Sequence, residues 1–369
     1  MIGILTFHWA DDCGALLQAY ALKCRLEELA GEAEIIPYAP VKLEGRYRLY
    51  PIYGETRDVR NSFRHMIREN LPLGRSFWAR RRRMRAFRRK YLTAQRPLRR
   101  VDGLSLEKYE AVVVGSDQVW NPDITMDLDD AYVGNIPRKG NCRLVSYGAS
   151  VSGHVFSQAE EEKLKRCVGG GFSEISLRER ADADRLERLL GRKVWDVLDP
   201  VLLLDPSRWK ALARPPAREG YILLYMTQPH EPLVRCALAL SARLGKEIIS
   251  LSPSENVGAV PDGAVEIRIE IGPQEFLGYI QNAGLVLTNS FHATAFSVLM
   301  EKPFLTFRHS ERNVRLWELL HGLGLESLLV EDIPEEAVFP LWESIDWKET
   351  RRRLREKREA SEKFILENL

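Results

Sequence analysis

The stretch LVLTNSFHATAFSVLMEKPFLTF, residues 285–307, contains two short apolar runs with a longer apolar segment between them. Leu285–Thr288 and Phe304–Phe307 have the length and composition of buried strands. Ala293–Met300 has the length and apolar character of a packed helix. Strand, helix and strand in this order predict a parallel βαβ unit.

The same alternation extends towards the N-terminus of this stretch and predicts a doubly wound domain. The expected strands are Tyr221–Met226, Glu247–Leu251 and Glu266–Ile269, and the expected helices are Glu231–Leu244 and Pro273–Gln281.

The first half of the chain shows a second α/β pattern. It begins with a strand at Ile2–Thr6, a helix at Gly14–Leu29 and a strand at Glu34–Ile36. Further short apolar runs predict strands at Ala111–Val114, Leu144–Ser146, Glu174–Leu177 and Val194–Leu198.

A chain of 369 residues fits two domains of usual size. Prolines and glycine between residues 206 and 220 indicate a linker. We predict an N-terminal α/β domain at 1–205 with a basic helical insertion near 57–100, a C-terminal Rossmann-like domain at 206–340 and a helical tail at 341–369.

Charge and cysteine content narrow the class of protein. The net charge of +2, from 54 basic and 52 acidic residues, excludes a globally basic nucleic-acid binder, and we expect no nucleic-acid partner. Five cysteines without CxxC spacing favour free thiols and no metal site. No apolar run approaches the about 20 residues of a membrane helix, and no signal peptide is recognisable. We expect a soluble, cytoplasmic protein.

The segment Arg75–Arg100 has no acidic residue, and aromatic residues are interleaved with its arginines. Two interpretations are open. The segment contacts anionic lipid head groups or a diphosphate-linked acceptor, which would bring the protein to the inner face of the membrane. Alternatively, it is a solvated helical face.

Polar residues follow several predicted strands, where ligands bind in open α/β sheets. In the first half these are Ser116, Asp117 and Gln118 after one strand. Gly14 after another strand opens a helix, whose first N–H groups can bind an anion. The alternative for the Gly14 turn is an ordinary helix start capped by Asp12.

Arginines and a histidine follow other strands. Arg178 suits a carboxylate or phosphate, with a surface salt bridge as the alternative. His292 follows Asn289 and Ser290 and suits proton transfer near neutral pH. Three further arginines suit an anionic ligand, with a solvated helix start as the alternative: Arg308, Arg312 and Arg315.

Taken in order, these segments resemble the motifs of the polysaccharide pyruvyl transferase family. The matching segments are Gly14–Leu22, Val114–Asn121, Ser146–Ser150, Ser176–Glu179, Asp199-Pro200 and Ser290–His292. The chain departs from the family pattern at three places. Asp12-Cys13 replaces Asn-Tyr, Ala293 replaces glycine, and Ser290 stands where some members have an arginine that helps hold the donor.

The resemblance implies a fold similar to B-type glycosyltransferases, with two Rossmann-like domains facing a cleft. It implies transfer of a pyruvyl group from phosphoenolpyruvate, as donor substrate, to a saccharide, forming a ketal without a metal or cofactor. His292 would be the acid or acid/base, Asp117 would position or deprotonate an acceptor hydroxyl, and Arg178 would hold the donor anion.

Some relatives act on saccharides carried by lipid diphosphates, so free and lipid-linked acceptors both stay open. Two other functions also stay open. One is a B-type glycosyltransferase that uses a nucleotide sugar. The other is a non-catalytic glycan-binding relative.

Overall fold

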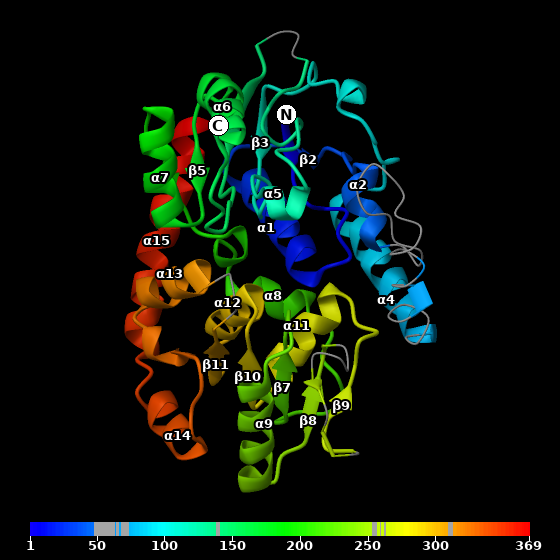
Figure 1. Cartoon of the computed structure of the whole chain (residues 1–369), viewed down its shortest axis with the longest axis vertical. Helices are drawn as coiled ribbons and strands as arrows, with labels where there is room; N and C mark the ends of the chain where they lie inside the picture. Colours follow the sequence, from blue (N-terminus) through cyan, green and yellow to red (C-terminus); the bar gives the residue numbers. More distant parts are fainter. Residues whose placement is uncertain are drawn as a thin grey trace. The chain divides into compact units, whose positions relative to one another are not determined.

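The structure is a computed structural model that describes residues 1–47, 63, 66–67, 74–137, 141–252, 257–258, 260–261, 263–308 and 313–369. The chain divides into two compact units (Figure 1). Unit 1 comprises Met1–Phe77, Met84–Leu203 and Lys357–Leu369, and unit 2 comprises Trp78–Arg83 and Leu204–Glu356. The boundary thus follows residue 203, against 205 in the sequence prediction, and the predicted tail is shared between the units.

Unit 1 is built on a four-stranded parallel sheet in the order β2-β1-β3-β4. Its strands are β1 (Ile2–Leu5), β2 (Ala33–Ile35), β3 (Ala111–Val114) and β4 (Arg143–Ser146). A bridge between Val145 and Glu174 connects β4 to a small parallel pair, β5 (Ser176–Leu177) and β6 (Trp195–Asp196). All residues of β1 and β3 are buried, as expected for a parallel sheet covered on both faces.

The helices of the first half are α1 (Cys13–Leu29), α2 (Val41–Glu44), α4 (Gly74–Phe87), α5 (Pro122–Thr125), α6 (Gln158–Leu164) and α7 (Arg180–Leu190). Helix α4 continues into a π-helical turn, η3 (Arg88–Leu92). Part of the predicted basic insertion, residues 57–62, 64–65 and 68–73, lies outside the described residues.

Unit 2 contains a six-stranded parallel sheet in the order β12-β11-β10-β7-β8-β9. The strands are β7 (Ile222–Tyr225), β8 (Ile248–Ser250), β9 (Glu266–Ile267), β10 (Leu285–Thr288), β11 (Phe304–Phe307) and β12 (Leu329–Val330). Counted from its first strand, this is the 3-2-1-4-5-6 order of the Rossmann fold. The predicted α/β class is therefore confirmed.

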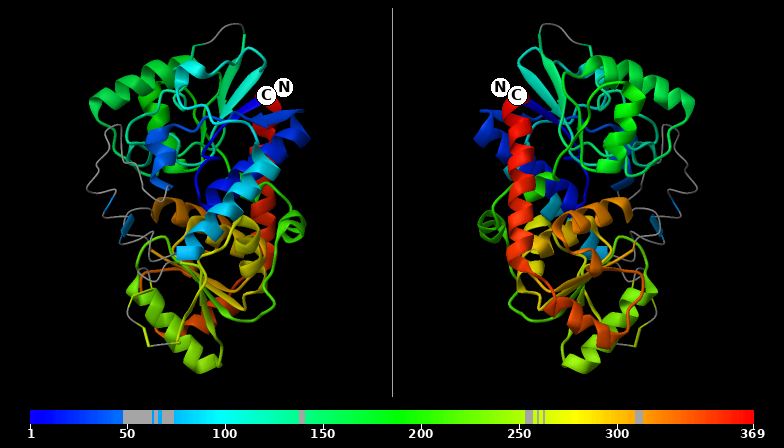
Figure 2. Two further views of the ribbon diagram at one scale, coloured as in Figure 1. Left: turned by 90° about the vertical axis from the view of Figure 1, so that its right-hand side faces the viewer. Right: turned by 90° about the vertical axis from the view of Figure 1, so that its left-hand side faces the viewer.

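The helices of the second half are α8 (Pro206–Leu212), α9 (Glu231–Leu244), α11 (Pro273–Asn282), α12 (Phe291–Leu299), α13 (Asn313–Leu323), α14 (Glu335–Glu343) and α15 (Trp347–Asn368). Helix α9 packs on β7 and β8, and α12 packs on β10 and β11. Helix α15 contributes its first ten residues to unit 2 and the rest to unit 1. Figures 1 and 2 show the N- and C-terminal residues at the same end of unit 1.

Helix α12 begins at Phe291, two residues before the predicted start at Ala293. The reason is Ser290, whose extended backbone (φ −99°, ψ 132°) makes it the N-cap residue. His292 therefore lies inside the first turn of the helix rather than in the loop before it.

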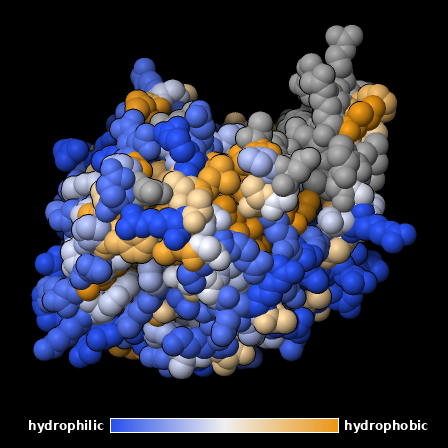
Figure 3. Space-filling view, turned by 90° about the horizontal axis from the view of Figure 1, so that it is seen from below, coloured by the Kyte–Doolittle hydropathy of each residue, from blue (hydrophilic) through white to orange (hydrophobic). Residues whose placement is uncertain are grey.

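None of the described helices is long and apolar enough to cross a membrane. On the face of the molecule drawn in Figure 3, hydrophilic side chains predominate and surround a smaller hydrophobic patch.

Candidate active site

Strands β1 and β3 are neighbours in the unit 1 sheet, although the chain visits β2 between them. This is a topological switch point, the place where open α/β sheets bind ligands beyond the carboxyl ends of their strands. The loop after β1 leads into α1, whose first turn contains the buried Gly14. The loop after β3 contains Ser116 and Asp117.

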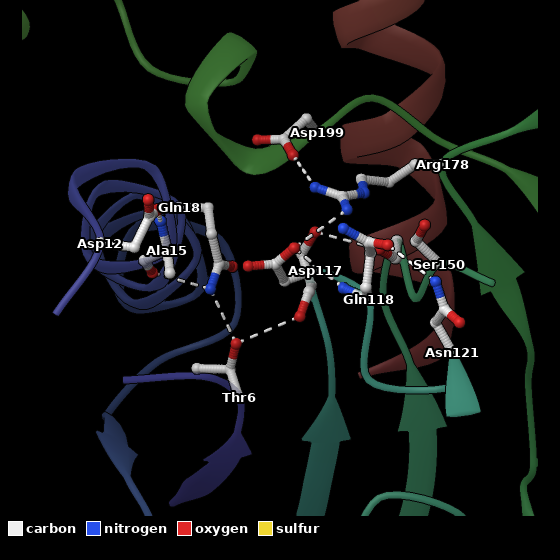
Figure 4. A network of polar contacts seen from close by, with 12 residues as sticks. Thr6, Asp12, Ala15, Gln18, Asp117, Gln118, Asn121, Ser150, Arg178 and Asp199 are labelled. Atoms are coloured by element: carbon white, nitrogen blue, oxygen red, sulfur yellow. Dashed lines mark hydrogen bonds and ion pairs between the residues drawn. The ribbon is translucent and has the colours of Figure 1, made fainter. Parts of the chain in front are cut away.

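Hydrogen bonds connect the ends of these strands (Figure 4). The Thr6 hydroxyl donates to the Ser116 carbonyl (3.1 Å), and Gln18 Nε2 of α1 donates to the Thr6 hydroxyl (2.8 Å). Gln18 Nε2 also donates to the Ala15 carbonyl, which fixes the orientation of the amide. Gln18 is fully buried, and its Oε1 accepts no hydrogen bond from a described residue. A buried acceptor of this kind requires a water or a ligand hydroxyl.

Asp12 caps the start of α1, as the simpler of the two sequence hypotheses predicted. Its Oδ1 accepts a hydrogen bond from Ala15 N (2.8 Å). Asp and Asn are equally good N-cap residues. The departure from the family's Asn-Tyr at residue 12 therefore preserves the local structure.

The turn after β3 requires an unusual backbone. Gly115 has φ of 114°, and a Cβ at this position would lie 2.4 Å from the Tyr147 carbonyl oxygen. Asp117 has φ of 77°, in the left-handed region that residues other than glycine rarely occupy. Such strain, of order 1–3 kcal/mol, is frequent at functional sites.

Asp117 is held by the Arg178 guanidinium, which follows β5. Arg178 Nη2 donates to Asp117 Oδ1 (3.2 Å), and Nη1 donates to Asp199 Oδ2. Glu179 is also close enough to interact with Arg178 electrostatically, and its Oε1 accepts a hydrogen bond from the Ser150 hydroxyl (2.7 Å). Figure 4 shows Arg178 between Asp117 and Asp199.

The Arg178 side chain is only 2% exposed. Burial alone would lower the pKa of its guanidinium, but Asp199, Asp117 and Glu179 raise this pKa above its usual value. The Arg178 guanidinium therefore stays charged, and carboxylates of the protein itself bind it. The structure places it as a residue that positions Asp117, and its predicted contact with the donor stays a prediction.

Ser116 and Gln118 are also engaged within the protein. The Ser116 hydroxyl donates to the Gly148 carbonyl (3.0 Å), and Gln118 Oε1 accepts from Asn121 Nδ2 (2.8 Å). Ser116 is fully buried and Gln118 is 7% exposed. These contacts fix the loop that presents Asp117.

His8 lies in the loop after β1 and is buried. Its Nδ1 is 3.2 Å from the Thr6 carbonyl, which can only accept, so Nδ1 carries the proton and Nε2 the lone pair. Burial, together with the charge of Arg88, lowers the pKa of His8 to about 3. Arg88 Nε also donates to the His8 carbonyl (2.7 Å), which holds this loop against η3.

Unit 2 has its own switch point, between β7 and β10. Asn289, at the end of β10, joins the two strand ends. Its Oδ1 accepts from Thr227 N (2.8 Å), and its Nδ2 donates to the Gln228 carbonyl (3.2 Å). Both ends of the Asn289 amide are thus used to shape the loops rather than left for a substrate.

The predicted Ser290-Phe291-His292 turn begins α12 beside Asn289. The His292 ring is partly exposed and makes an edge contact with Phe291 (5.4 Å between ring centroids). The Arg315 guanidinium of α13 lies 5.6 Å from the centroid of the Phe291 ring. The Ser290 carbonyl accepts from the Thr294 hydroxyl (2.9 Å), which fixes the helix start.

Of the other predicted arginines, Arg308 follows β11 with an exposed side chain, and Arg312 lies outside the described residues. Arg315 is buried. Within the part of the chain that the structure describes, no group of three or more His, Cys, Asp or Glu residues is arranged to hold a metal ion.

Sequence reasoning missed the roles of Asp199, Glu179, Gln18 and His8. Asp199 and Glu179 belong to segments quoted as family motifs, but neither was assigned a contact. Their pairing with residues 21 to 29 positions away follows from the order of strands in the sheet. No local pattern indicates it.

A family model described as polysaccharide pyruvyl transferase matches residues 12–311. The chain belongs to the polysaccharide pyruvyl transferase family. The match includes β3, β7 and β10 and confirms the resemblance drawn from the motifs. It also places the chain in a family of transferases. No curated protein matches the sequence.

Solved structures also resemble this pyruvyl transferase family member. The UDP-GlcNAc 2-epimerase of Methanocaldococcus jannaschii matches with a TM-score of 0.50 and 13% identity, over 96% of this chain and 98% of that chain. The UDP-GlcNAc 2-epimerase of Neisseria meningitidis matches with a TM-score of 0.45 and 13% identity, over 99% and 93% of the two chains. An Escherichia coli heptosyltransferase matches with a TM-score of 0.36 and 11% identity, over 83% and 87%.

At such low identity, the M. jannaschii likeness shows the fold alone. The predicted class of two Rossmann-like domains, similar to B-type glycosyltransferases, is confirmed. The predicted cleft between the domains stays a prediction.

Proposed function

We propose that this protein transfers the pyruvyl group of phosphoenolpyruvate to a saccharide and forms a pyruvate ketal. The family membership supports the reaction class. The observation that carries the proposal is the placement of the family's motif residues. The motif residues after β3 and β10 lie at the switch points of the two sheets, where this fold binds ligands, and Arg178, after β5, binds Asp117.

Ketal formation from phosphoenolpyruvate requires the following bonds to form and break. Two acceptor hydroxyl oxygens form bonds to the central carbon of the donor, whose C=C bond becomes a C–CH₃ single bond and whose C–O bond to phosphate breaks. The acceptor hydroxyls lose two protons. One is balanced by the proton that the methylene carbon gains, and the other leaves with the phosphate. The protein must therefore supply an acid, a base and compensation for the donor's negative charge.

We assign proton transfer to His292 and the orientation of the acceptor to Asp117. His292 lies in the first turn of α12 and is partly exposed, although its Nε2 is buried. Asp117 is held by Arg178, so its carboxylate is fixed before the acceptor arrives. Gln18 Oε1 lacks a donor among the described residues and suits an acceptor hydroxyl. General acid–base assistance is worth on the order of 10²–10⁴ in rate.

For the donor anion we favour Arg308 as the first contact. It is exposed at the carboxyl end of β11 and has no acidic partner among the described residues. Arg315 lies against Phe291 and supports the positive field beside His292. Arg178 acts through Asp117. The acceptor is a saccharide, free or linked to a lipid diphosphate.

The test measures donor use and product formation with purified protein and a panel of saccharides. Phosphate release from phosphoenolpyruvate reports donor use, and the new ketal methyl group is detected by NMR. We expect His292→Gln to lower kcat by on the order of 10²-fold or more. We expect Arg308→Gln to raise KM for phosphoenolpyruvate more than it lowers kcat.

The control is His321→Gln, at an exposed histidine of α13 stacked on Trp317, which should keep full activity. Thermal stabilisation by a nucleotide sugar but not by phosphoenolpyruvate would instead favour a glycosyltransferase. Saccharide binding without consumption of either donor would favour a non-catalytic relative. Full activity of His292→Gln would remove this histidine from the reaction.

A further inference from the structure

Helix α4 has one face of arginines around a tryptophan. Arg75, Trp78, Arg82 and Arg85 are spaced three, four and three residues apart, so they line one side of the helix over about 15 Å. Met84 and Phe87 are buried on the other side. We call the exposed residues Arg75, Trp78, Arg82, Arg85 and Arg89 the α4 stripe; Arg89 continues it into η3.

The stripe arginines differ from Arg83 of α4 and Arg88 of η3. Arg83 lies 3.7 Å from a Glu275 carboxylate oxygen, and Arg88 lies 2.9 Å from Asp11. By contrast, no described acidic residue pairs with the four exposed arginines of the stripe, and none of them has a further interaction. Their charges are thus uncompensated within the described protein.

Four such arginines lie on one helix face, in a chain whose 52 acidic residues nearly match its basic ones. Several exposed arginines elsewhere have carboxylates close by. The examples are Arg218 with Glu247 and Glu266, Arg235 with Asp332, Arg351 with Glu301, and Arg352 with Glu349 and Glu356. The stripe is a concentrated positive surface on a protein with a net charge of only +2.

The stripe also has an apolar component. Trp78 is 57% exposed in the middle of it. Tryptophan beside arginine is the side-chain combination that favours the interface of a bilayer, where the ring enters the head-group region and the cations meet anionic lipid. A polyanion without an apolar layer would bind only the arginines and would not bury the Trp78 ring.

We propose that the α4 stripe docks this protein on a membrane surface that contains anionic lipid. The inference rests on α4 alone and not on the proposed pyruvyl transfer. Each basic side chain near such a surface contributes about fivefold to binding, and the contribution weakens with salt. Trp78 adds a contribution that salt does not weaken, because it comes from burial of the ring.

The test is co-sedimentation of the full chain with vesicles of phosphatidylcholine alone, or of phosphatidylcholine mixed with phosphatidylglycerol. We expect binding only to the mixed vesicles, and weaker binding at high salt. Replacing the four stripe arginines together should reduce the affinity by at least about tenfold. The variant carries Arg75→Gln, Arg82→Gln, Arg85→Gln and Arg89→Gln.

The matched control removes the same formal charge from paired arginines, with Arg218→Gln, Arg235→Gln, Arg351→Gln and Arg352→Gln, and should bind like the parent. Trp78→Ala should weaken vesicle binding at high salt as well as at low salt. Equal loss in the stripe and control variants would overturn the proposal. So would tighter binding to double-stranded DNA than to the mixed vesicles, or an absence of vesicle binding by the parent protein.

Discussion

Arg178 is a buried cation that faces Asp117, Asp199 and Glu179. Removing one side of a buried ion pair leaves uncompensated charge and typically lowers the free energy of unfolding by about 3–5 kcal/mol. We therefore expect Arg178→Met to lower it by an amount of this order in urea denaturation.

Arg180 supplies the control for this substitution, because it also pairs with two carboxylates but its side chain is 66% exposed. Arg180→Met should change the free energy of unfolding by less than about 1 kcal/mol. Similar losses in the two variants would show that the burial of the Arg178 cluster does not matter for stability.

The lowered pKa of His8 leads us to expect a specific dependence of the free energy of unfolding on pH. Its pKa is about 3 in the folded protein, against 6.5 for an ordinary histidine. Below pH 6.5 the unfolded chain binds a proton that the folded chain does not, so stability is complete above pH 6.5 and falls as the pH decreases towards 3. At pH 5 the loss due to His8 should be about 2 kcal/mol.

The measurement compares urea unfolding at pH 7.5 and 5 in the parent and in His8→Asn, which keeps a donor near the Thr6 carbonyl. The difference between the two proteins isolates His8 from other groups, including His230, whose pKa is also lowered by burial. An identical decline in both proteins would mean that His8 is protonated in the folded state.

Sequence alone identified which candidate residues follow strand ends better than what each one contacts. Asp117, Arg178 and His292 are all at or just after the ends of strands, as expected. Their hydrogen-bond partners could not be predicted, because Arg178 meets Asp117 from 61 positions away. Pairings of that range depend on the order of strands, which buried apolar runs do not specify.

At the scale of single elements, the first turn of α1 depends on Asp12, which accepts a hydrogen bond from Ala15 N. Loss of an N-cap side chain lowers the free energy of unfolding by about 1 kcal/mol. We expect Asp12→Ala to show a loss of this size in urea denaturation, and Asp12→Asn to show almost none. A loss as large in Asp12→Asn would indicate that the negative charge, rather than the cap, stabilises the turn.

The strands whose bounds were predicted to the residue are buried throughout. Three predicted strands have the same bounds as observed strands: Ala111–Val114 is β3, Leu285–Thr288 is β10 and Phe304–Phe307 is β11. Strand β12 (Leu329–Val330) was missed; it directly follows a 3-10 turn. Its pairing with β11 defines it.

At the scale of the whole molecule, the second part of α15 completes unit 1. Phe364 is buried, and its ring contacts Tyr147 and Trp195. We expect Phe364→Ala to lower the free energy of unfolding by about 3–5 kcal/mol, because it leaves a cavity in a packed core.

The matched control is Leu366→Ala, two residues further along the same helix, where the side chain is 60% exposed. It should be nearly neutral. Hydrogen exchange should locate the effect of Phe364→Ala in β4 and β6 of unit 1. Exchange that increases only in unit 2 would contradict the assignment of this part of the helix.

The sharing of α15 has a consequence for how the protein forms during synthesis. The sheet of unit 1 begins with Ile2, yet Leu198 N donates to the Ser361 hydroxyl, and Phe364 fills the core beside Tyr147. A ribosome must therefore translate past residue 364 before the N-terminal half has its native packing. Residues 204–356, which make up most of unit 2, leave the ribosome earlier than this. Unit 1 is therefore not completed before unit 2 has been synthesised, in contrast to the usual order in which N-terminal domains are completed first.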